Sequence, residues 1–561
     1  MTLVCVPIFV EDIDAALRDA AGARDGGADL VEWRLDTFFH GSTGSDAEDA
    51  VVVRELQRLL AESPLPAILT CRPAWEGGEY DGDDADRVAL FEKLCNPDRP
   101  EHAPAYLDVE LAAYTRSANL RQKIDLCVAH PRQQRDVKTR LILSTHDFEG
   151  RPADLDRRLL AAYDAPACSI VKVAYRARSL RDNLDLFELT RGAPKPTIAL
   201  GMGEFGLMSR VLAPKFGGYL TFASLRDTTV TAPGQPTLDD LLNLYRFRSI
   251  GRDTRVYGVI GWPVGHSLSP HVHSAGFKAV GHDGVYLPLP IAADPNDAEA
   301  SYLSFRETHQ SLLNADLLFA GASVTIPHKA NLLRQYDGHW DRTGVATAVG
   351  VANTLCVEWE QIHGLWDIDG YGIFNTDTQA IQELADEALG TLRARKISIV
   401  GAGGAARAAA YACLQRGAQV SVFNRSLERA VALADSFESL VDEGWEASIR
   451  ANPYEQLAGS SCDLYINCTP VGMTGGPDPD GLSIPVPDMP NVTPDTVFFD
   501  TVYNPIETPM LRAARERGCQ TIDGVEMFVR QAAAQFELWT SKPAPTQLFD
   551  RICREKLAPR P

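Results

Sequence analysis

Short apolar or β-branched runs alternate with longer amphipathic stretches over residues 1–247. This alternation is typical of βα units arranged around a parallel sheet. The apolar runs occupy residues 3–8, 30–35, 67–72, 105–110, 141–148, 169–175, 197–203 and 219–225. Eight such runs over this length predict a closed (β/α)₈ TIM barrel, with an open sheet as the alternative.

The pattern changes after residue 247. A short basic linker, 248–254, precedes a new apolar strand that starts at Arg255. Residues 396–426 read as one βαβ unit: a strand, a glycine-rich turn, a helix of small residues and a second strand. We therefore expect a two-lobed second half, with a substrate lobe over 255–385, a Rossmann dinucleotide lobe over 386–520, and a C-terminal helix region over 521–561 that returns to the substrate lobe.

Composition narrows the functional class. The 561 residues carry 54 Lys and Arg against 75 Asp and Glu, a net charge of −21, which argues against nucleic acid or an anionic membrane as a partner. No apolar run approaches the ~18 residues of a membrane span, and the N-terminus lacks the basic region of a targeting peptide. The eleven cysteines include no CxxC pair, which favours a reducing cytoplasm and indicates no zinc site. Oligomeric state stays open.

Lys172 is the first candidate for chemistry. It shares a strand face with Ile170 and Ala174, and the carboxyl ends of barrel strands are where active sites form. Burial there disfavours the ammonium form and frees the amine to attack a carbonyl as a Schiff-base nucleophile. His146, which ends the preceding strand, can shuttle the proton that an elimination needs. The alternative is a lysine at a strand end that reaches solvent.

Further ionisable residues fall at the ends of other predicted strands. Glu32 and Arg34 lie two apart on one strand face, and Arg72 ends the next strand. Arg210 adds another guanidinium that suits a carboxylate or hydroxyl groups. Each could instead form a structural ion pair, but several cations that converge on one rim favour a binding site.

These segments together resemble type I 3-dehydroquinate dehydratase over nearly the whole barrel half. The matching stretches are VEWRLD (31–36), TCRPAWEGGEY (70–80), LSTHDF (143–148), VKVAY (171–175), GLMSR (206–210) and TAPGQ (231–235). The resemblance implies that Lys172 forms the imine, that His146 is the general acid–base and that Glu76 supports it. It assigns substrate binding to Glu32, Arg34, Arg72, Arg210, Thr231 and Gln235. Two positions depart from the pattern, because Thr231 and Pro7 stand where relatives often have Ser.

The second half carries a dinucleotide motif. GAGGAA (401–406) follows an apolar strand and opens a helix, so Gly401, Ala402, Gly403, Gly404 and Ala405 would cradle a pyrophosphate. The next strand ends in Asn424, Arg425 and Ser426, with Arg429 one turn later, where a ribose-binding carboxylate would otherwise stand. Guanidinium groups suit a 2′-phosphate and favour NADP over NAD. The alternative is that both arginines are solvated residues at a helix start.

Upstream, hydroxyl side chains in SLSP (267–270) and SVTIPHK (323–329) suit a carboxylate or polyol, and Lys329 is a candidate acid–base. With AVGVANTL (348–355), INCTPVGM (466–473), DTVYNPIETP (500–509) and DGVEMFVRQAA (523–533), they resemble shikimate dehydrogenase. The resemblance implies that an Asp pairs with Lys329, that Thr501 and Gly524 lie near the nicotinamide, and that substrate is bound by Ser267, Ser269, Thr325, Asn353, Tyr503 and Gln531. Ser323 replaces the usual Asn.

Two aspartates compete for the place beside Lys329. In the family that Asp closes an Asn-Thr-Asp motif, which this chain has at 375–377. Asp369 lies 16 residues after Asn353 and Asp377 lies 24 after it, which implies an inserted hairpin if Asp377 is correct. The intact motif, directly followed by an amphipathic stretch, favours Asp377, with Asp369 as the alternative.

The two implied activities are consecutive: dehydration of 3-dehydroquinate to 3-dehydroshikimate, then NADPH-dependent reduction to shikimate. The whole chain thus resembles the fused bifunctional enzymes of aromatic amino-acid biosynthesis, a lyase joined to an oxidoreductase. One alternative is a second half that prefers quinate with NAD. Another is a ligand-sensing homologue without catalysis, which the presence of Lys172, His146 and Lys329 argues against.

Overall fold

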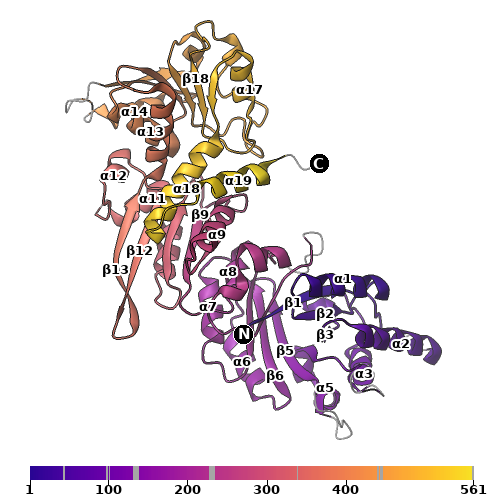
Figure 1. Ribbon diagram of the computed structural model, residues 1–561. Coiled ribbons are helices and arrows are strands. Elements are labelled where there is room, and N and C mark those ends of the chain that lie inside the picture. Colours follow the sequence, from indigo (N-terminus) through magenta and orange to yellow (C-terminus); the bar gives the residue numbers. More distant parts are fainter. Residues whose placement is uncertain are drawn as a thin grey trace. The chain divides into compact units, whose positions relative to one another are not determined.

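The structure is a computed structural model that describes residues 1–41, 45–96, 99, 102–129, 138–226, 234–337, 339–438, 441 and 447–558. The chain divides into two compact units, Met1–Thr254 and Arg255–Pro561. Figure 1 colours the first from indigo to magenta and the second from pink to yellow. Within the described ranges, no helix combines the length and apolar character needed to cross a bilayer.

The first unit is a parallel β-barrel, as the eight apolar runs predicted. Its strands are β1 (Leu3–Phe9), β2 (Leu30–Arg34), β3 (Ala67–Thr70), β4 (Tyr106–Glu110), β5 (Arg140–Asp147), β6 (Cys168–Arg176), β7 (Thr197–Met202) and β8 (Leu220–Phe222). They pair in the order β7-β6-β5-β4-β3-β2-β1-β8. The backbone N–H of Tyr219, just before β8, donates to the carbonyl of Thr197 in β7 over 2.9 Å and brings the two end strands together.

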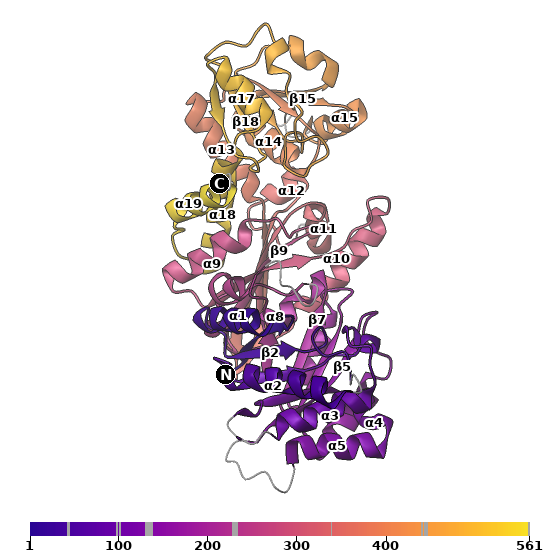
Figure 2. The same cartoon turned by 90° about the vertical axis from the view of Figure 1, so that its right-hand side faces the viewer.

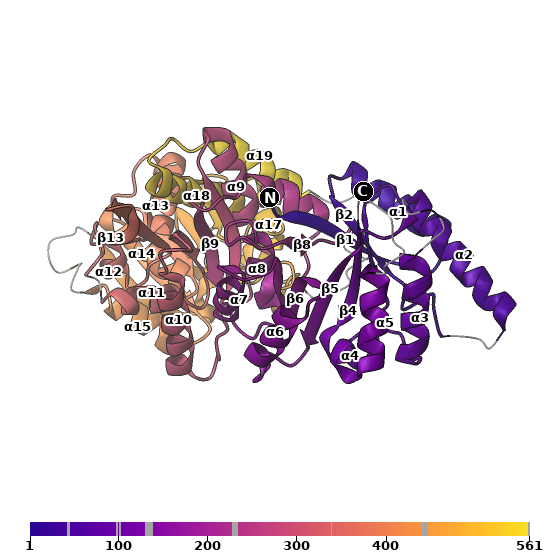
Figure 3. The same cartoon turned by 90° about the horizontal axis from the view of Figure 1, so that it is seen from below.

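Helices lie outside these strands (Figure 3). They are α1 (Ile13–Asp25), α2 (Asp46–Glu62), α3 (Asp84–Cys95), α4 (Leu111–Arg116), α5 (Ala118–Ala129), α6 (Leu155–Asp164), α7 (Asp182–Thr190) and α8 (Leu207–Val211). Inside the barrel, buried residues such as Ile68, Ile142, Ile170 and Ile198 form one apolar cluster. Because side chains alternate along a strand, Lys172 points inward directly above Ile170.

The second unit begins with a five-stranded sheet of order β10-β9-β11-β12-β13. Its strands are β9 (Arg255–Gly261), β10 (Gly284–Pro290), β11 (Phe319–Val324), β12 (Thr354–Ile362) and β13 (Leu365–Phe374), and its helices are α9 (Ser269–Val280), α10 (Ala298–Leu312), α11 (Lys329–Tyr336) and α12 (Val345–Val349). Strands β9, β10 and β11 run parallel, whereas β12 and β13 form an antiparallel hairpin.

The other sheet is parallel, with the order β16-β15-β14-β17-β18-β19. It contains β14 (Lys396–Val400), β15 (Gln419–Asn424), β16 (Ser448–Pro453), β17 (Leu464–Asn467), β18 (Val497–Asp500) and β19 (Gln520–Ile522), with α13 (Thr376–Leu389), α14 (Gly404–Gln415), α15 (Leu427–Asp435) and α17 (Pro509–Glu516). Alternate residues face two cores: Ile399 belongs to the cluster with α13, α14 and α15, and Val400 to the cluster with α17. Figure 2 shows α17 and α14 beside this sheet. This is the predicted Rossmann arrangement.

Helix α18 (Gly524–Thr540) runs from this sheet back to the first one, and α19 (Thr546–Leu557) follows it. The indole N–H of Trp539 donates to the carbonyl of Leu355 in β12 over 2.9 Å, and the amide of Gln535 donates to Thr354 over 3.0 Å. Helix α18 therefore packs against the first residues of β12.

Candidate active sites

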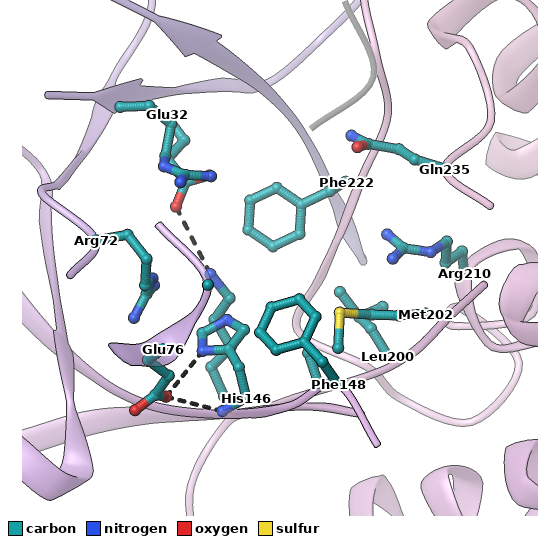
Figure 4. A pocket seen from close by; sticks show the side chains of 14 residues that line it. Glu32, Arg72, Glu76, His146, Phe148, Leu200, Met202, Arg210, Phe222 and Gln235 are labelled. Carbon is teal, nitrogen blue, oxygen red and sulfur yellow. Dashed lines mark hydrogen bonds and ion pairs between the residues drawn. The ribbon is translucent and has the colours of Figure 1, made fainter. Parts of the chain in front are cut away.

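The barrel unit has a polar pocket that holds every predicted barrel site residue the structure describes. Figure 4 shows their side chains converging on one space. The polar lining consists of Glu32, Arg34, Arg72, Glu76, His146, Lys172, Arg210 and Gln235. Thr231 lies outside the described residues, and Pro7 pairs with Glu32 between β1 and β2.

Lys172 is buried, with 5% of its surface exposed. Its Nζ donates to Oδ2 of Asp108 over 2.9 Å and lies 3.6 Å from Oε1 of Glu32. The ring of Phe222 faces the same nitrogen, with its centroid 4.6 Å away. The alternative of a lysine that reaches solvent is therefore wrong.

His146 is held by Glu76, which lies in a short 3₁₀ turn (Ala74–Glu76) after β3. Oε1 of Glu76 accepts the backbone N–H of His146 over 2.8 Å and lies 3.0 Å from Nδ1 of the ring. Burial, with the nearby cations Arg72 and Lys172, holds the pKa of His146 well below its usual range. Burial also raises the pKa of Glu76 to about 8. The imidazole is therefore neutral near pH 7 and able to accept a proton.

Two of the three arginines of the pocket, Arg72 and Arg210, differ in their partners. Arg72 donates to Glu110 over 2.6 Å and to Asp108 over 2.7 Å, so its charge is matched by two buried carboxylates. Arg210 is also buried, and Nε donates to the carbonyl of Gly201 over 3.1 Å. Within the described ranges Arg210 pairs with no carboxylate, and burial lowers its pKa to about 10. Arg210 is thus the cation that an anionic ligand would neutralise.

Asp108 and Glu110 are buried carboxylates behind the pocket that the sequence reasoning did not select. Both lie in β4, which Glu110 ends, and both are fully buried. The signal was present, because two carboxylates two residues apart on a barrel strand share a face, as Glu32 and Arg34 do. What the sequence did not reveal is that Asp108 reaches the amine of Lys172.

In the second unit, Lys329 and Asp377 meet. Nζ of Lys329, the first residue of α11, donates to Oδ2 of Asp377 over 2.5 Å. Asp377 lies in the first turn of α13, which Asn375 caps by accepting the N–H of Thr378. Asp369 instead lies in β13, exposed on the long antiparallel hairpin. The aspartate that contacts Lys329 is therefore the one in the intact Asn-Thr-Asp motif. The additional residues before that motif form a hairpin, as this assignment implied.

Sheet topology brings four of the other predicted substrate residues, Ser267, Ser269, Thr325 and Asn353, to the same edge. Ser267 and Ser269 follow β9, and Thr325 follows β11, so they lie at the carboxyl ends of two parallel strands. Asn353 precedes the antiparallel β12, and its carbonyl accepts the N–H of Val324 over 2.7 Å. Gln531, in the second turn of α18, donates to the carbonyl of Phe528 over 3.1 Å.

The glycine-rich turn lies between β14 and α14, at the point where the strand order reverses from β14 to β17. Gly401 has a φ of 118°, and an added Cβ there would lie 3.0 Å from the carbonyl oxygen of Cys468. An added Cβ at Gly404 would lie 3.4 Å from Cδ of Lys329, so the turn adjoins the Lys329–Asp377 pair. Among the described residues, no side chain caps the N-terminus of α14. The turn therefore has the features of a dinucleotide site.

Two arginines follow β15, the strand that pairs with β14. Asn424 ends β15 and donates to the carbonyl of Ser426, which caps α15. Arg425 and Arg429 are both exposed and make no ion pair in the part of the chain that the structure describes. The residues present therefore fit a 2′-phosphate.

The loop after β18 carries Thr501, which is predicted to lie near the nicotinamide. Thr501 donates its backbone N–H to Asn467 over 3.0 Å, and the ring of Tyr503 packs 5.1 Å from that of Phe528. An added Cβ at Gly524 would lie 2.2 Å from the carbonyl oxygen of Val502, so only glycine permits this approach of α18 to the loop.

Comparison with known proteins relates both units to enzyme families. Residues 4–252 match the family "Type I 3-dehydroquinase", 259–355 "Shikimate dehydrogenase substrate binding domain", 383–445 "Shikimate / quinate 5-dehydrogenase" and 524–551 "Shikimate 5'-dehydrogenase C-terminal domain". A chloroplastic bifunctional 3-dehydroquinate dehydratase/shikimate dehydrogenase of Arabidopsis thaliana is 36% identical over 559 residues, covering 98% of this chain and 84% of the relative. The chain belongs to this bifunctional family.

Two further proteins are similar to this chain over both units. The shikimate biosynthesis protein AroDE of Chlamydia pneumoniae is 28% identical over 91% of this chain and 90% of its own length. The dehydroquinate dehydratase and shikimate dehydrogenase part of S. pombe AroM is 24% identical, with a TM-score of 0.40 and 98% of each chain covered. The first unit is the dehydratase unit and the second the NADP-dependent dehydrogenase unit.

Proposed function

We propose that the dehydratase unit converts 3-dehydroquinate to 3-dehydroshikimate through an imine on Lys172, and that the dehydrogenase unit reduces this product to shikimate. The observation that carries the first step is the buried Lys172 amine, which lies in one pocket with the neutral base His146 and the cation Arg210. A ketone that bears a carboxylate and hydroxyl groups fits this set of side chains.

In the dehydratase unit, each side chain has a distinct task. Lys172 attacks the ketone, and the iminium acidifies the neighbouring C–H bond. His146 removes that proton as a neutral base and returns a proton to the departing hydroxyl, while Glu76 orients its ring. Arg210 binds the substrate carboxylate. Glu32, Arg34, Gln235 and Thr231 remain the proposed ligands of the hydroxyl groups and carboxylate, with Arg72 at the pocket wall.

In the dehydrogenase unit, NADPH supplies a hydride to the ketone when bound. Gly401–Ala405 would hold the pyrophosphate, Asn424, Arg425, Ser426 and Arg429 the 2′-phosphate end, and Thr501 and Gly524 the nicotinamide end. Lys329 donates a proton to the substrate oxygen, and Asp377 fixes the ammonium in place. Ser267, Ser269, Thr325, Asn353, Tyr503 and Gln531 hold the hydroxyl and carboxylate groups of the substrate.

A coupled assay tests both steps. The chain is incubated with 3-dehydroquinate and NADPH, and shikimate formation is followed by chromatography. Lys172→Ala should leave 3-dehydroquinate unchanged but still reduce added 3-dehydroshikimate, whereas Asp377→Asn should accumulate 3-dehydroshikimate. If the unaltered chain forms neither 3-dehydroshikimate nor shikimate from 3-dehydroquinate, the proposal is contradicted.

Choice of substrate and compartment are finer proposals. Two serines at 267 and 269 and the arginine pair favour shikimate with NADP over quinate with NAD, which kcat/KM values for both pairs would decide. The eleven cysteines all lie within the described residues and form no disulfide, which supports the cytoplasm as a reducing compartment. The small-molecule substrates are its proposed partners, and the net charge of −21 supports neither nucleic acid nor an anionic membrane as a partner.

A further inference from the structure

Asp108 is the carboxylate closest to the Lys172 nitrogen. It is fully buried, and Oδ2 accepts the Lys172 ammonium over 2.9 Å. Its other oxygen, Oδ1, accepts Arg72 over 2.7 Å and the hydroxyl of Ser144 over 2.6 Å. Three donors therefore fix one carboxylate against the nitrogen that the proposed reaction modifies.

A chain of buried ion pairs holds this carboxylate in place from behind. Arg72 shares Glu110 with Arg87, which donates to the other oxygen of Glu110 over 2.6 Å. Arg87 is fully buried and also donates to the carbonyl of Cys71, next to Arg72, over 2.7 Å. Oδ1 of Asp84, at the start of α3, accepts a hydrogen bond from Nη2 of Arg87 over 2.8 Å. The network leaves Arg72 little freedom to turn away from Asp108.

Electrostatics keep Asp108 charged. Burial opposes ionisation, but Arg72 and Lys172 outweigh it and hold the pKa of Asp108 well below its usual range. The other carboxyl groups near the Lys172 nitrogen differ from Asp108 in distance or in protonation. Glu32 lies 3.6 Å from the Lys172 nitrogen and accepts the hydroxyl of Thr70. Burial raises the pKa of Glu76 to about 8, so it is largely protonated near pH 7.

We propose that Asp108 is a further catalytic residue of the dehydratase unit: its carboxylate is the counter-ion of the Lys172 nitrogen in both the ammonium and the iminium form. The inference rests on the proposed imine chemistry. The face of Phe222, 4.6 Å from the same nitrogen, independently favours a cation there.

The charge balance of imine formation explains why a permanently ionised partner suits this step. Overall, the ammonium and the ketone yield a protonated imine and water. One ammonium proton is transferred first, which frees the lone pair that forms the C–N bond; a second proton follows after the attack, and both leave with the carbonyl oxygen when the C–O bond breaks. The third proton and the positive charge stay on nitrogen. Asp108 therefore needs to exchange no proton, and its charge favours the iminium, which is the form that withdraws electrons from the neighbouring C–H bond.

The test compares Asp108→Asn with the unaltered full-length chain. Asparagine keeps the size of the side chain, removes its charge and replaces one acceptor oxygen by an amide donor. We expect the dehydratase kcat to fall at least 100-fold, with shikimate oxidation by the dehydrogenase unit unchanged within two-fold. Asp29→Asn is the matched control, because Asp29 accepts Arg248 and the N–H of Val4 at the amino-terminal end of the barrel, away from Lys172. It should retain wild-type dehydratase turnover.

The outcomes distinguish failure of the counter-ion role from failure of the proposed imine chemistry. If the unaltered chain forms a borohydride-trapped adduct on Lys172 while Asp108→Asn turns over within three-fold of it, the counter-ion role is refuted and the imine stands. If the unaltered chain forms no adduct, the proposed function fails first. Should Asp108→Asn lose the cooperative unfolding transition of the barrel, Ser144→Ala decides: a kcat at least five-fold lower supports the role, and a change below two-fold overturns it.

Discussion

The Lys329 ammonium donates to the Asp377 carboxylate over 2.5 Å, although the two residues are separated by 48 positions and two intervening strands. The contact forms because β11 and β13 both end at the same edge of the sheet, where α11 and α13 begin. The hairpin of β12 and β13 extends away from this edge and carries Asp369 with it.

Asp377→Asn should therefore reduce the kcat of shikimate oxidation at least about 100-fold, the range expected for loss of an acid–base group. Asp369→Asn is the matched control and should stay within two-fold of wild type, because its exposed side chain lies on the hairpin. Steady-state kinetics with NADP⁺ measure both. An inactive Asp369 variant beside an active Asp377 variant would reverse the assignment.

Lys172→Ala should abolish both dehydration and borohydride trapping, because a reduced imine requires this amine. Peptide mass spectrometry locates the adduct in the unaltered chain. Shikimate oxidation in the same preparation serves as the control for folding of the second unit. A trapped adduct on any other lysine would contradict the role of Lys172.

Replacing Arg425 and Arg429 together by Ala should weaken NADP⁺ binding selectively. Each lost charge-assisted contact to a phosphate costs roughly 1.5–3 kcal/mol, or about ten-fold or more in affinity. Titration calorimetry with NADP⁺ and with NAD⁺ measures the difference directly. An equal loss for both cofactors would mean that neither arginine contacts the 2′-phosphate.

Arg210→Met should raise the KM for 3-dehydroquinate at least ten-fold, since the buried guanidinium has no carboxylate partner of its own among the described residues. The thermal midpoint of the barrel should not fall, because methionine removes an uncompensated buried charge. The KM for shikimate, which is bound in the other unit, is the internal control. An unchanged KM for 3-dehydroquinate would exclude Arg210 as the carboxylate ligand.

Glu76 gives the barrel a pH-dependent stability. Its pKa is raised from 4.5 to about 8 by burial, so the folded state favours the protonated form. The resulting stability is complete below pH 4.5 and is lost as the pH rises through 8. Relative to Glu76→Gln, which does not titrate, the wild-type free energy of unfolding should fall by up to a few kcal/mol across this window. Parallel stability curves for the two proteins would contradict the shift.

Most of the fold could be predicted because its signals are local. Each of the eight apolar runs became a barrel strand, and the run that contains Ile170 and Lys172 already showed which residues share a face. The Asn-Thr-Asp motif likewise located Asp377, since its first residue is a helix cap and caps are local features.

The ion pairs of the barrel wall could not be predicted in the same way. Strand register places Glu110 beside Ser144, and Ser144 beside Lys172, across β4, β5 and β6. The residue that the Lys172 side chain contacts, Asp108, lies one layer lower on β4. Such a contact depends on register and on side-chain direction across three strands, and no spacing along one segment encodes either.

Each unit holds its own proposed catalytic lysine and that lysine's acidic partner. This separation has a genetic consequence. A cell that carries two alleles, one with Lys172→Ala and the other with Asp377→Asn, should grow without added aromatic amino acids, because the diffusible intermediate made by one chain can be used by the other. Neither allele alone should support that growth.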